Sequence, residues 1–316
     1  MYSFSYEVTG GGGVFLFKHK LMHHLFVVLS IVFCLASCSP GETASDEQVK
    51  ENNDPEENRL VTTTVANTEI TDTLELDLIG VPESYKSLPD RYKGLPSVGD
   101  PHGPDPEILR SLDPKEVLSV STIEYDAKEY FEQAGVNVRY LNLDNIDHMH
   151  EEILQLGEDY DREEQAKELV QTFEDKVEEI TEEVADKEHP KVLILMGVPG
   201  SYLVGTENSY IGNLVEIAGG KNVIEGEDRD FISSNTEHLQ QTNPDVILRA
   251  AHGMPEEVVE MFDEEFKEND IWKHFDAVKN NRVYDLEESL FGTTGNIHAV
   301  ESLDVLFDML YEDESF

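Results

Sequence analysis

Two histidines in similar loops are the residues of this chain whose type and placement most favour chemistry. His102 and His252 each stand beside glycine and proline, in segments whose composition predicts loops. Imidazole nitrogens are good ligands for transition metals and for the iron of a haem. Two imidazoles that face each other across a cleft can therefore hold such a metal. A single loop histidine is more often a simple surface residue, so this interpretation depends on whether the fold brings the two together.

A repeated pattern places one histidine in each half of the chain. Residues 107–118 and 237–248 both follow the pattern Glu-x-Leu-x-x-x-x-Pro-x-x-x-Leu. Each copy predicts a short helix, a turn at the proline and then a buried strand. Two copies of one structural unit indicate two similar lobes. We therefore expect His102 to belong to the first lobe and His252 to the second.

One long amphipathic segment lies between the two copies. Over 161–188 the apolar residues recur at helical spacing, with no internal glycine or proline. They are Ala166, Leu169, Val170, Phe173, Val177, Ile180 and Val184. A helix of this length measures about 42 Å, enough to cross a small domain. We predict a connecting helix at 159–188 that joins the lobes rigidly. An ordinary surface helix or a coiled-coil arm is the alternative that the pattern leaves open.

Strand-like and helix-like segments alternate on both sides of this helix. In 59–158 the alternation predicts a parallel α/β sheet. In 189–316 the apolar runs 191–198 and 245–249 are typical of strands buried on both faces. The predicted fold class is therefore α/β, with two Rossmann-like lobes joined by the single long helix. Ligands of such sheets bind beyond the carboxyl ends of the strands, and His252 lies at such an end.

The charge balance excludes several kinds of partner. The 316 residues include 67 acidic and 23 basic ones, which gives a formal net charge of −44. Binding to nucleic acid requires lysines and arginines that neutralise phosphates, so no nucleic-acid partner is expected. An anionic membrane surface is excluded for the same reason. Because the acidic residues are spread along the chain, we interpret them as a solvated surface suited to high salt, and a halophilic source is a hypothesis.

The N-terminal segment, 1–37, is typical of a signal peptide. Residues 25–36 are apolar but too short to span a membrane comfortably. The sequence Leu-Ala-Ser-Cys that ends at Cys38 resembles a bacterial lipobox. The resemblance implies cleavage before Cys38 and attachment of lipid, with acyl chains such as palmitate, to its sulfur; a plain secretory signal is the alternative. Residues 38–58 are polar and acidic, and we expect them to form a flexible tether.

Several long strings in 59–312 resemble one known family. They are LPDRYKGLPSVGDP (88–101), VLSVSTIEYD (117–126), HPKVLILMGVPGSYLVGTENSYIG (189–212), SSNTE (233–237), NPDVILR (243–249) and NDIWKHFDAVKNNRVYDLEE (269–288). Through them the chain resembles the haem-receptor lipoproteins of the iron-regulated surface determinant system, which are class III substrate-binding proteins of ABC transporters. The resemblance implies a monomer on the extracytoplasmic face of the cell membrane, with haem in the cleft between its lobes. It also implies an ABC permease and surface haem-relay proteins as partners.

The resemblance assigns the two histidines to the haem iron, with one departure from the family. In the family the iron is held by a methionine from the first lobe and a histidine from the second. The histidine corresponds to His252, whereas the methionine position is occupied by His102. The resemblance therefore implies two imidazole ligands, which should give a lower reduction potential than a methionine ligand. Met254 is a rival ligand but comes from the same lobe as His252, and His298 also lies in a loop that can approach the cleft.

In the family, the carboxylates of haem are bound by the first lobe. The corresponding positions here are Thr64, Val65, Ala66, Ser84 and Tyr85. The free N–H groups at the start of a helix bind anions well, and 65–74 is predicted to be a helix that follows a strand. Ordinary helix capping and turn structure is the alternative explanation for these residues.

Two acidic residues resemble those by which such proteins dock on arginines of the permease. They are Glu107 and Glu237, one in each copy of the repeat. Pairs of arginine and carboxylate are strong and directional. Helix capping is the alternative, above all for Glu237, because 234–237 has the sequence of a capping box.

Other functions stay open at this point. A receptor for another iron complex, such as a siderophore or cobalamin, and a zinc-binding lipoprotein that uses several histidines belong to the same class of binding proteins. A siderophore site usually needs cationic or aromatic residues, and the chain has few basic ones. A haem-degrading enzyme is a different class. It needs an open position on the iron, and the sequence has no nucleophile elbow, phosphate loop or HExxH motif, so we expect no catalysis.

Overall fold

The computed structural model describes residues 58–233, 239 and 241–311. All of these belong to one compact unit. The predicted signal peptide, the lipidation site Cys38, nearly all of the tether and the docking residue Glu237 lie outside the described residues. Within the described part of the chain, no helix combines the length and the apolar character that a membrane span requires.

The first lobe is built on a four-stranded parallel sheet in the order β2-β1-β5-β6. Alternate side chains enter different cores, since Leu60 and Leu118 belong to one apolar cluster and Val61 and Val117 to another. The sheet is therefore covered on both faces, as expected for parallel strands. The elements are β1 (Leu60–Thr62), α2 (Val65–Thr73), β2 (Leu78–Gly80), η1 (Asp90–Tyr92), β3 (Gly99–Asp100), β4 (Gly103–Pro104), α3 (Pro106–Leu112), β5 (Glu116–Val120), η2 (Ser121–Ile123), α4 (Glu124–Ala134) and β6 (Val138–Leu141).

The second lobe has a mixed sheet in the order β10-β8-β7-β11-β12, with β9 beside β7. Strands β7, β11 and β12 are parallel, whereas β8 runs antiparallel to β7 because Gly200, with a φ of 83°, reverses the chain directly. The elements are β7 (Lys191–Val198), β8 (Ser201–Gly205), α7 (Tyr210–Ile217), β9 (Lys221–Asn222), β10 (Phe231–Ser233), β11 (Val246–Ala251), α9 (Pro255–Glu268), η3 (Trp272–His274), α10 (Asp276–Lys279), β12 (Val283–Asp285) and α11 (Ala299–Tyr311).

The predicted long helix is present but shorter, and it is one of a pair. Helix α6 (Glu163–Val184) has 22 residues, and α5 (Ile146–Asp159) packs beside it. Helix α6 begins later than predicted because Asp161 takes a left-handed φ of 56° in the turn between the two helices. The pair is close-packed at Gly157, where a Cβ would lie 2.5 Å from the Cβ of Ala166.

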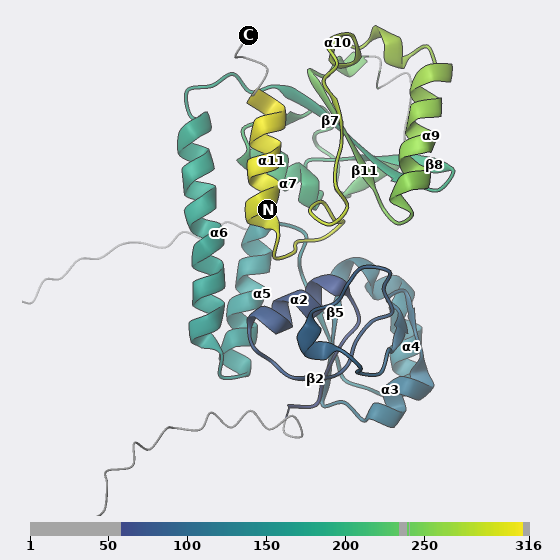
Figure 1. Ribbon diagram of the computed structural model, residues 1–316, viewed down its shortest axis with the longest axis vertical. Helices are drawn as coiled ribbons and strands as arrows, with labels where there is room; N and C mark the ends of the chain where they lie inside the picture. Colours follow the sequence, from purple (N-terminus) through teal and green to yellow (C-terminus); the bar gives the residue numbers. More distant parts are fainter. Residues whose placement is uncertain (1–57, 234–238, 240, 312–316) are drawn as a thin grey trace, which may run out of the picture. The chain divides into compact units, whose positions relative to one another are not determined.

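Helix α6 is not a free-standing strut. Helix α11 of the second lobe lies along it, on the same side of the molecule as α5 (Figure 1). Most of the predicted apolar stripe is buried, and its largest side chain, Phe173, stacks on His150 of α5 with ring centroids 5.4 Å apart. A single amphipathic helix would leave this stripe in water, so the helical pair and α11 together form the connection between the lobes.

The two lobes also touch through hydrogen bonds from main-chain amides close to α5. The Gly295 amide donates a hydrogen bond to the Leu143 carbonyl at 2.6 Å, and the Ile146 amide donates to the side-chain oxygen of Asn213 at 3.0 Å. The chain thus meets the second lobe before α5 begins and returns to it at the end of α6. The mixed α/β fold, with one main sheet in each lobe and a helical connection, confirms the predicted fold class.

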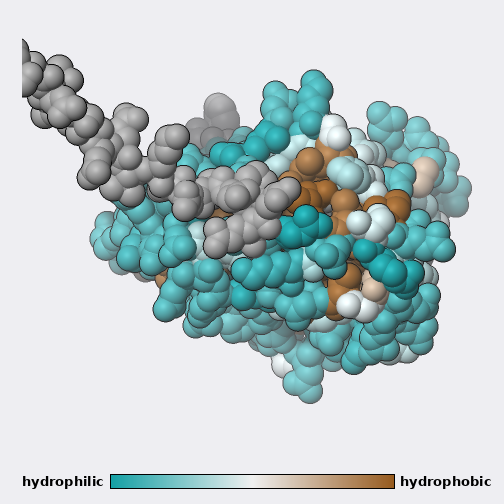
Figure 2. All heavy atoms as spheres, turned by 90° about the horizontal axis from the view of Figure 1, so that it is seen from below, coloured by the Kyte–Doolittle hydropathy of each residue, from teal (hydrophilic) through white to brown (hydrophobic). Residues whose placement is uncertain are grey.

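The surface is mainly polar on the side that Figure 2 shows. One area of hydrophobic residues lies among the polar ones on this face.

The first copy of the sequence repeat forms α3 and β5, and the strand of the second copy forms β11. The helical half of the second copy falls largely outside the described residues. Where both copies are described, each repeat therefore ends in a central strand of its own sheet.

Candidate functional site

His102 lies in the turn of a small hairpin in the first lobe. Strands β3 and β4 pair antiparallel, with Gly99 opposite Pro104 and Asp100 opposite Gly103, so Pro101 and His102 form the connecting turn. The sequence had predicted only an irregular loop here. Two-residue ladders give little hydrophobic signal, so sequence patterning could not reveal this hairpin.

Contacts on both sides fix the hairpin to the lobe. On one side Asp105, directly after β4, caps helix α3 by accepting hydrogen bonds from the amides of Glu107 and Ile108 at 2.8 and 3.2 Å. On the other side the ring of Tyr130 in α4 lies against Gly103, where an added Cβ would be 3.4 Å from the ring. His102 therefore stands on a supported turn rather than on a free loop.

His252 directly follows β11 in the second lobe. Its amide donates to the Gly197 carbonyl at 2.9 Å, which prolongs the pairing of β11 with β7 by one residue. Gly253 and Met254 then take left-handed φ values of 75° and 48°, and helix α9 begins at Pro255. His252 is thus held at the carboxyl end of a parallel strand pair, where the sequence placed it.

The structure brings the two imidazoles together from opposite lobes. Their ring centroids are 6.5 Å apart and their planes are inclined at 75°. With a metal–imidazole bond of about 2.0 Å, two rings that bind one metal atom from opposite sides have centroids roughly 6 Å apart. The spacing therefore suits a shared axial metal. Among the described residues, no cluster of three or more His, Cys, Asp or Glu side chains is arranged to hold a metal ion.

The electrostatics of the site favour the form of His252 that binds metals. Although water reaches this side chain, partial desolvation by the surrounding protein lowers its pKa, and the charges of His102 and Lys86 act in the same direction. Glu288 opposes them. A lowered pKa keeps the imidazole neutral at more acidic pH, and only a neutral imidazole has a lone pair for a metal.

Glu288 forms a junction between the lobes that sequence reasoning missed. Its carboxylate accepts hydrogen bonds from the Tyr85 hydroxyl and, at 3.2 Å, from the amide of Gly253, next to His252. The Lys86 ammonium donates to the Glu288 carbonyl at 3.0 Å and lies 3.7 Å from its carboxylate. Lys86 had a weak signal, as a cation beside Ser84 and Tyr85 in an acidic chain. Glu288 had none, because its partners are about 200 positions away in the sequence.

The predicted carboxylate-binding segment starts helix α2 as expected. Thr64 is the N-cap, and its hydroxyl accepts from the Asn67 amide at 3.3 Å. The first turn, which includes the half-buried Val65 and Ala66, contains no acidic residue. The side chain of Asn67 is fully buried, and its amide oxygen and nitrogen have no hydrogen-bond partner within the described residues. An acid-free first turn leaves the positive end of the helix dipole without a negative side chain of its own. Asn67 carried no sequence signal because it reads as helix interior.

Three further predicted residues are Ser84, His298 and Met254. The Ser84 hydroxyl oxygen accepts a hydrogen bond from the Lys86 amide at 2.9 Å, so Ser84 shapes the turn that carries the exposed Tyr85. Nε2 of His298 lies 3.6 Å from a carboxylate oxygen of Glu69 in α2, so the His298 side chain reaches the first lobe. Desolvation by the surrounding protein raises the pKa of Glu69, and the neighbouring His298 lowers it in part. Met254 is exposed.

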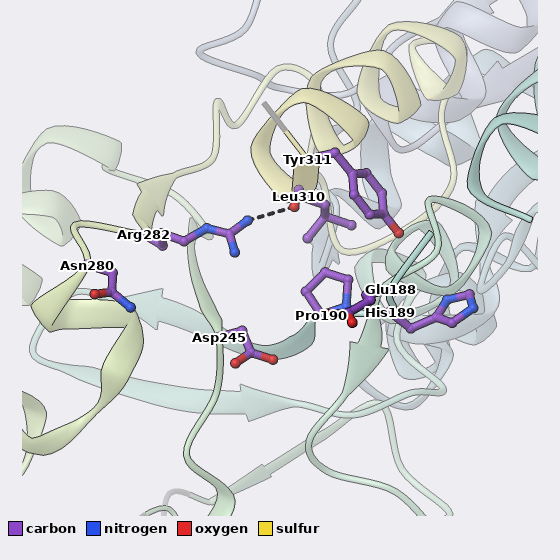
Figure 3. A pocket seen from close by; sticks show the side chains of 8 residues that line it. All are labelled: Glu188, His189, Pro190, Asp245, Asn280, Arg282, Leu310 and Tyr311. Atoms are coloured by element: carbon purple, nitrogen blue, oxygen red, sulfur yellow. Dashed lines mark hydrogen bonds between the residues drawn. The ribbon is translucent and has the colours of Figure 1, made fainter. Parts of the chain in front are cut away.

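A separate pocket of about 300 Å³ lies at the opposite end of the second sheet (Figure 3). It is bordered by the start of β7 and by Asp245 and Arg282, which precede β11 and β12. The Arg282 guanidinium points to the end of α11, where it donates to the Leu310 carbonyl at 2.7 Å. None of the predicted site residues lines this pocket.

Comparison with known proteins decides the family. A sequence model of the family described as Periplasmic binding protein matches residues 60–290, which is most of the chain. The chain belongs to the periplasmic binding protein family.

Two members of this family with high sequence identity carry informative names. The high-affinity heme uptake system protein IsdE of Staphylococcus aureus (strain bovine RF122 / ET3-1) is 48% identical over 298 residues, which cover 93% of this chain and 99% of the relative. The crystal structure of S. aureus IsdE complexed with heme has a TM-score of 0.78 and 52% identity, over 80% of this chain and 98% of that one. The crystal structure of an ABC transporter substrate-binding protein from Listeria monocytogenes EGD-e has a TM-score of 0.76 and 55% sequence identity, again over 80% of this chain and 98% of that one.

In this periplasmic binding protein, His102→Ala should raise the pKa of His252, because it removes a positive charge that lowers it. Glu288→Gln should lower that pKa, because it removes a negative charge that raises it. NMR titration of the histidine ring protons in the ligand-free protein measures both. Lys128→Ala, an exposed lysine on α4, is the control and should leave the titration of His252 as it is. An unchanged titration in His102→Ala would show that the two rings do not meet in solution.

Proposed function

We propose that this protein binds haem between its two lobes, with His102 and His252 as the axial ligands of the iron, and delivers it to an ABC permease for iron uptake. The observation that supports this most directly is the pair of imidazoles, one from each lobe, whose ring centroids are 6.5 Å apart. The likeness to IsdE over nearly the whole chain supports haem as the ligand. The protein is a transport receptor, and haem is its cargo rather than a resident cofactor.

Two imidazoles determine the state of the bound iron. They fill both axial positions and give a six-coordinate, low-spin haem. Two nitrogen ligands stabilise ferric iron more than a pair of histidine and methionine does, so the reduction potential is lower. Met254 cannot replace His102 as the opposite ligand, because it follows His252 in the same loop. A filled coordination sphere also leaves no open position for oxygen chemistry.

The start of α2 and the turn at Ser84 and Tyr85 bind the haem carboxylates. A chain with a net charge of −44 repels a dianion, so binding needs local donors. The free amides of the first turn around Thr64 supply them, and the side-chain amide of Asn67 is buried nearby without a partner among the described residues. Lys86 adds the cation that a helix terminus alone lacks.

Titration of the purified protein with haemin tests this function. Wild-type protein should give the visible bands of a bis-histidine haem, and His102→Ala and His252→Ala should each change the bands and weaken binding at least tenfold, or about 1.4 kcal/mol. His102→Met should restore a six-coordinate haem with a higher potential. His274→Ala is the control, since His274 is exposed in η3. Haem dimethyl ester should bind more weakly with unaltered bands. Unchanged bands in His102→Ala would refute this ligand.

Several outcomes of the same titration favour other cargoes. Saturable binding of cobalamin or of a ferric siderophore, together with no spectral change on addition of haemin, would replace haem by that ligand. Calorimetry with zinc tests the remaining alternative. Consumption of bound haem in the presence of a reductant would indicate an enzyme instead.

Docking to the permease is assigned to Glu107 and Glu237. Glu107 is exposed in the first turn of α3, and the side chain that caps this helix is that of Asp105. The carboxylate of Glu107 is therefore not used as the cap, which supports a role at the surface.

Cells that carry Glu107→Arg together with Glu237→Arg should lose haem uptake, because like charges then face the permease arginines. Haem binding by the purified variant should stay at the wild-type level. Glu129→Arg with Glu164→Arg, two exposed acids on α4 and α6, is the matched control for the change in net charge. Loss of haem binding in the first variant would contradict a docking role.

The protein is held at the extracytoplasmic face of the membrane by lipid on Cys38, and the segment up to residue 58 spaces the lobes from the bilayer. It acts as a monomer and accepts haem from surface relay proteins. The acidic surface serves solubility at high salt.

Cys38→Ser should release the protein from the membrane into the medium, because the sulfur that carries the lipid is missing. Cell fractionation with immunoblotting measures this. Cys34→Ser, within the apolar part of the signal, is the control and should remain with the membrane. Membrane retention of both variants would show that the anchor lies elsewhere.

A further inference from the structure

Asp100 contacts His102 at two points. The Asp100 carboxylate oxygen Oδ1 accepts the His102 amide at 2.8 Å, and the same oxygen lies 3.4 Å from Nδ1 of the imidazole. Asp100 is the last residue of β3 and is paired with Gly103 in the hairpin, so its backbone is fixed. A single carboxylate therefore faces one particular nitrogen of the ring.

This contact determines which ring nitrogen is left for a metal. A carboxylate is an acceptor, so it favours the tautomer with the proton on Nδ1. Nε2 of His102 then carries the free lone pair. Metal-bound histidines commonly donate their second N–H to a carboxylate, which orients the ring and makes it a stronger electron donor. At 3.4 Å from Nδ1, the Asp100 carboxylate lies at ion-pair distance, where a small rotation of either side chain allows this donation.

The two histidines differ in this respect. His252 is placed through main-chain amides: its own amide donates to the Gly197 carbonyl, and that of Gly253 donates to the Glu288 carboxylate. Among the described residues, no hydrogen bond or ion pair from another side chain reaches its ring. The residue that replaces the family's methionine thus has a charged side-chain partner, and the family histidine does not.

We propose that Asp100 is a positioning residue that holds the His102 imidazole with Nε2 towards the haem iron and lowers the reduction potential of the bound haem. This inference rests on the proposed function. A negative charge on the Nδ1–H side increases the electron density that the ring gives to iron, which stabilises ferric over ferrous haem. A thioether ligand has no N–H, so the carboxylate acquires this role only with histidine at position 102.

The test uses the haem-loaded full chain and four variants. Asp100→Asn keeps the shape and an acceptor for the His102 amide but removes the charge. It should retain bis-histidine bands, shift the midpoint potential to a more positive value and release haem about tenfold faster. Asp126→Asn, an exposed acid on α4, controls for net charge and should match wild type. His102→Met and His102→Met with Asp100→Asn complete a double-mutant cycle.

In the methionine background, Asp100→Asn should shift the potential much less than in the histidine background. Equal shifts in both backgrounds would show a general charge effect and overturn the role through Nδ1. A potential and a release rate for Asp100→Asn equal to those of Asp126→Asn would overturn it as well. If the wild-type protein still gives the bands of bis-histidine haem, either of these results overturns only the role of Asp100 and leaves the haem-binding function in place. If wild type binds no haem, both proposals fall together.

Discussion

The meeting of two imidazoles across the lobes depends on backbone hydrogen bonding. His252 is in place because its amide continues the pairing of β11 with β7. His102 is in place because a two-residue hairpin is fixed between the capped helix α3 and the ring of Tyr130. Each ring is thus an extension of a rigid element, and the distance between the rings is set by the two lobes rather than by the histidine side chains.

Besides the amide hydrogen bonds close to α5, the contacts that join the lobes differ between the region of the rings and α6. Near the rings they are polar and partly exposed, as between Lys86 and Glu288 or between His298 and Glu69. Such pairs contribute about 0–1 kcal/mol each, so they can exchange for contacts with a ligand at low cost. Along α6 the contact is mainly apolar and buried, with α11 against the predicted stripe and one ion pair, between Lys176 and Asp304 at 3.0 Å. The molecule therefore combines a firm helical seam with a polar region that can rearrange around a cargo.

The sequence predicted elements whose signal is local. The apolar run of β7 was found with its exact limits, because its hydrophobic pattern is strong. Helix α9 was missed although Pro255, the acidic first turn and the amphipathic pattern are local signals, and only the capping side chain at Met254 is lacking. The length of α6 was overestimated because nothing in the sequence marks the left-handed turn at Asp161.

For the candidate site, the loops of both histidines followed from their composition, but their meeting did not. It became an expectation only through the repeat and the resemblance. Glu288 and Asn67 were invisible for a physical reason. The partners of Glu288 are distant in sequence, and Asn67 is notable only because its buried amide finds no partner among the described residues. Long-range pairing and the lack of it are properties of the folded chain.

The acid-free first turn of α2 has a consequence for kinetics. With a net charge of −44, the protein repels an anionic porphyrin at long range, and the helix start attracts it only once it is near. At physiological ionic strength the repulsion is screened beyond about 8 Å, and molar salt shortens this range to about 3 Å. Salt slows the encounter of oppositely charged partners, whereas here it weakens the repulsion between two anions, so molar salt favours the approach of the porphyrin.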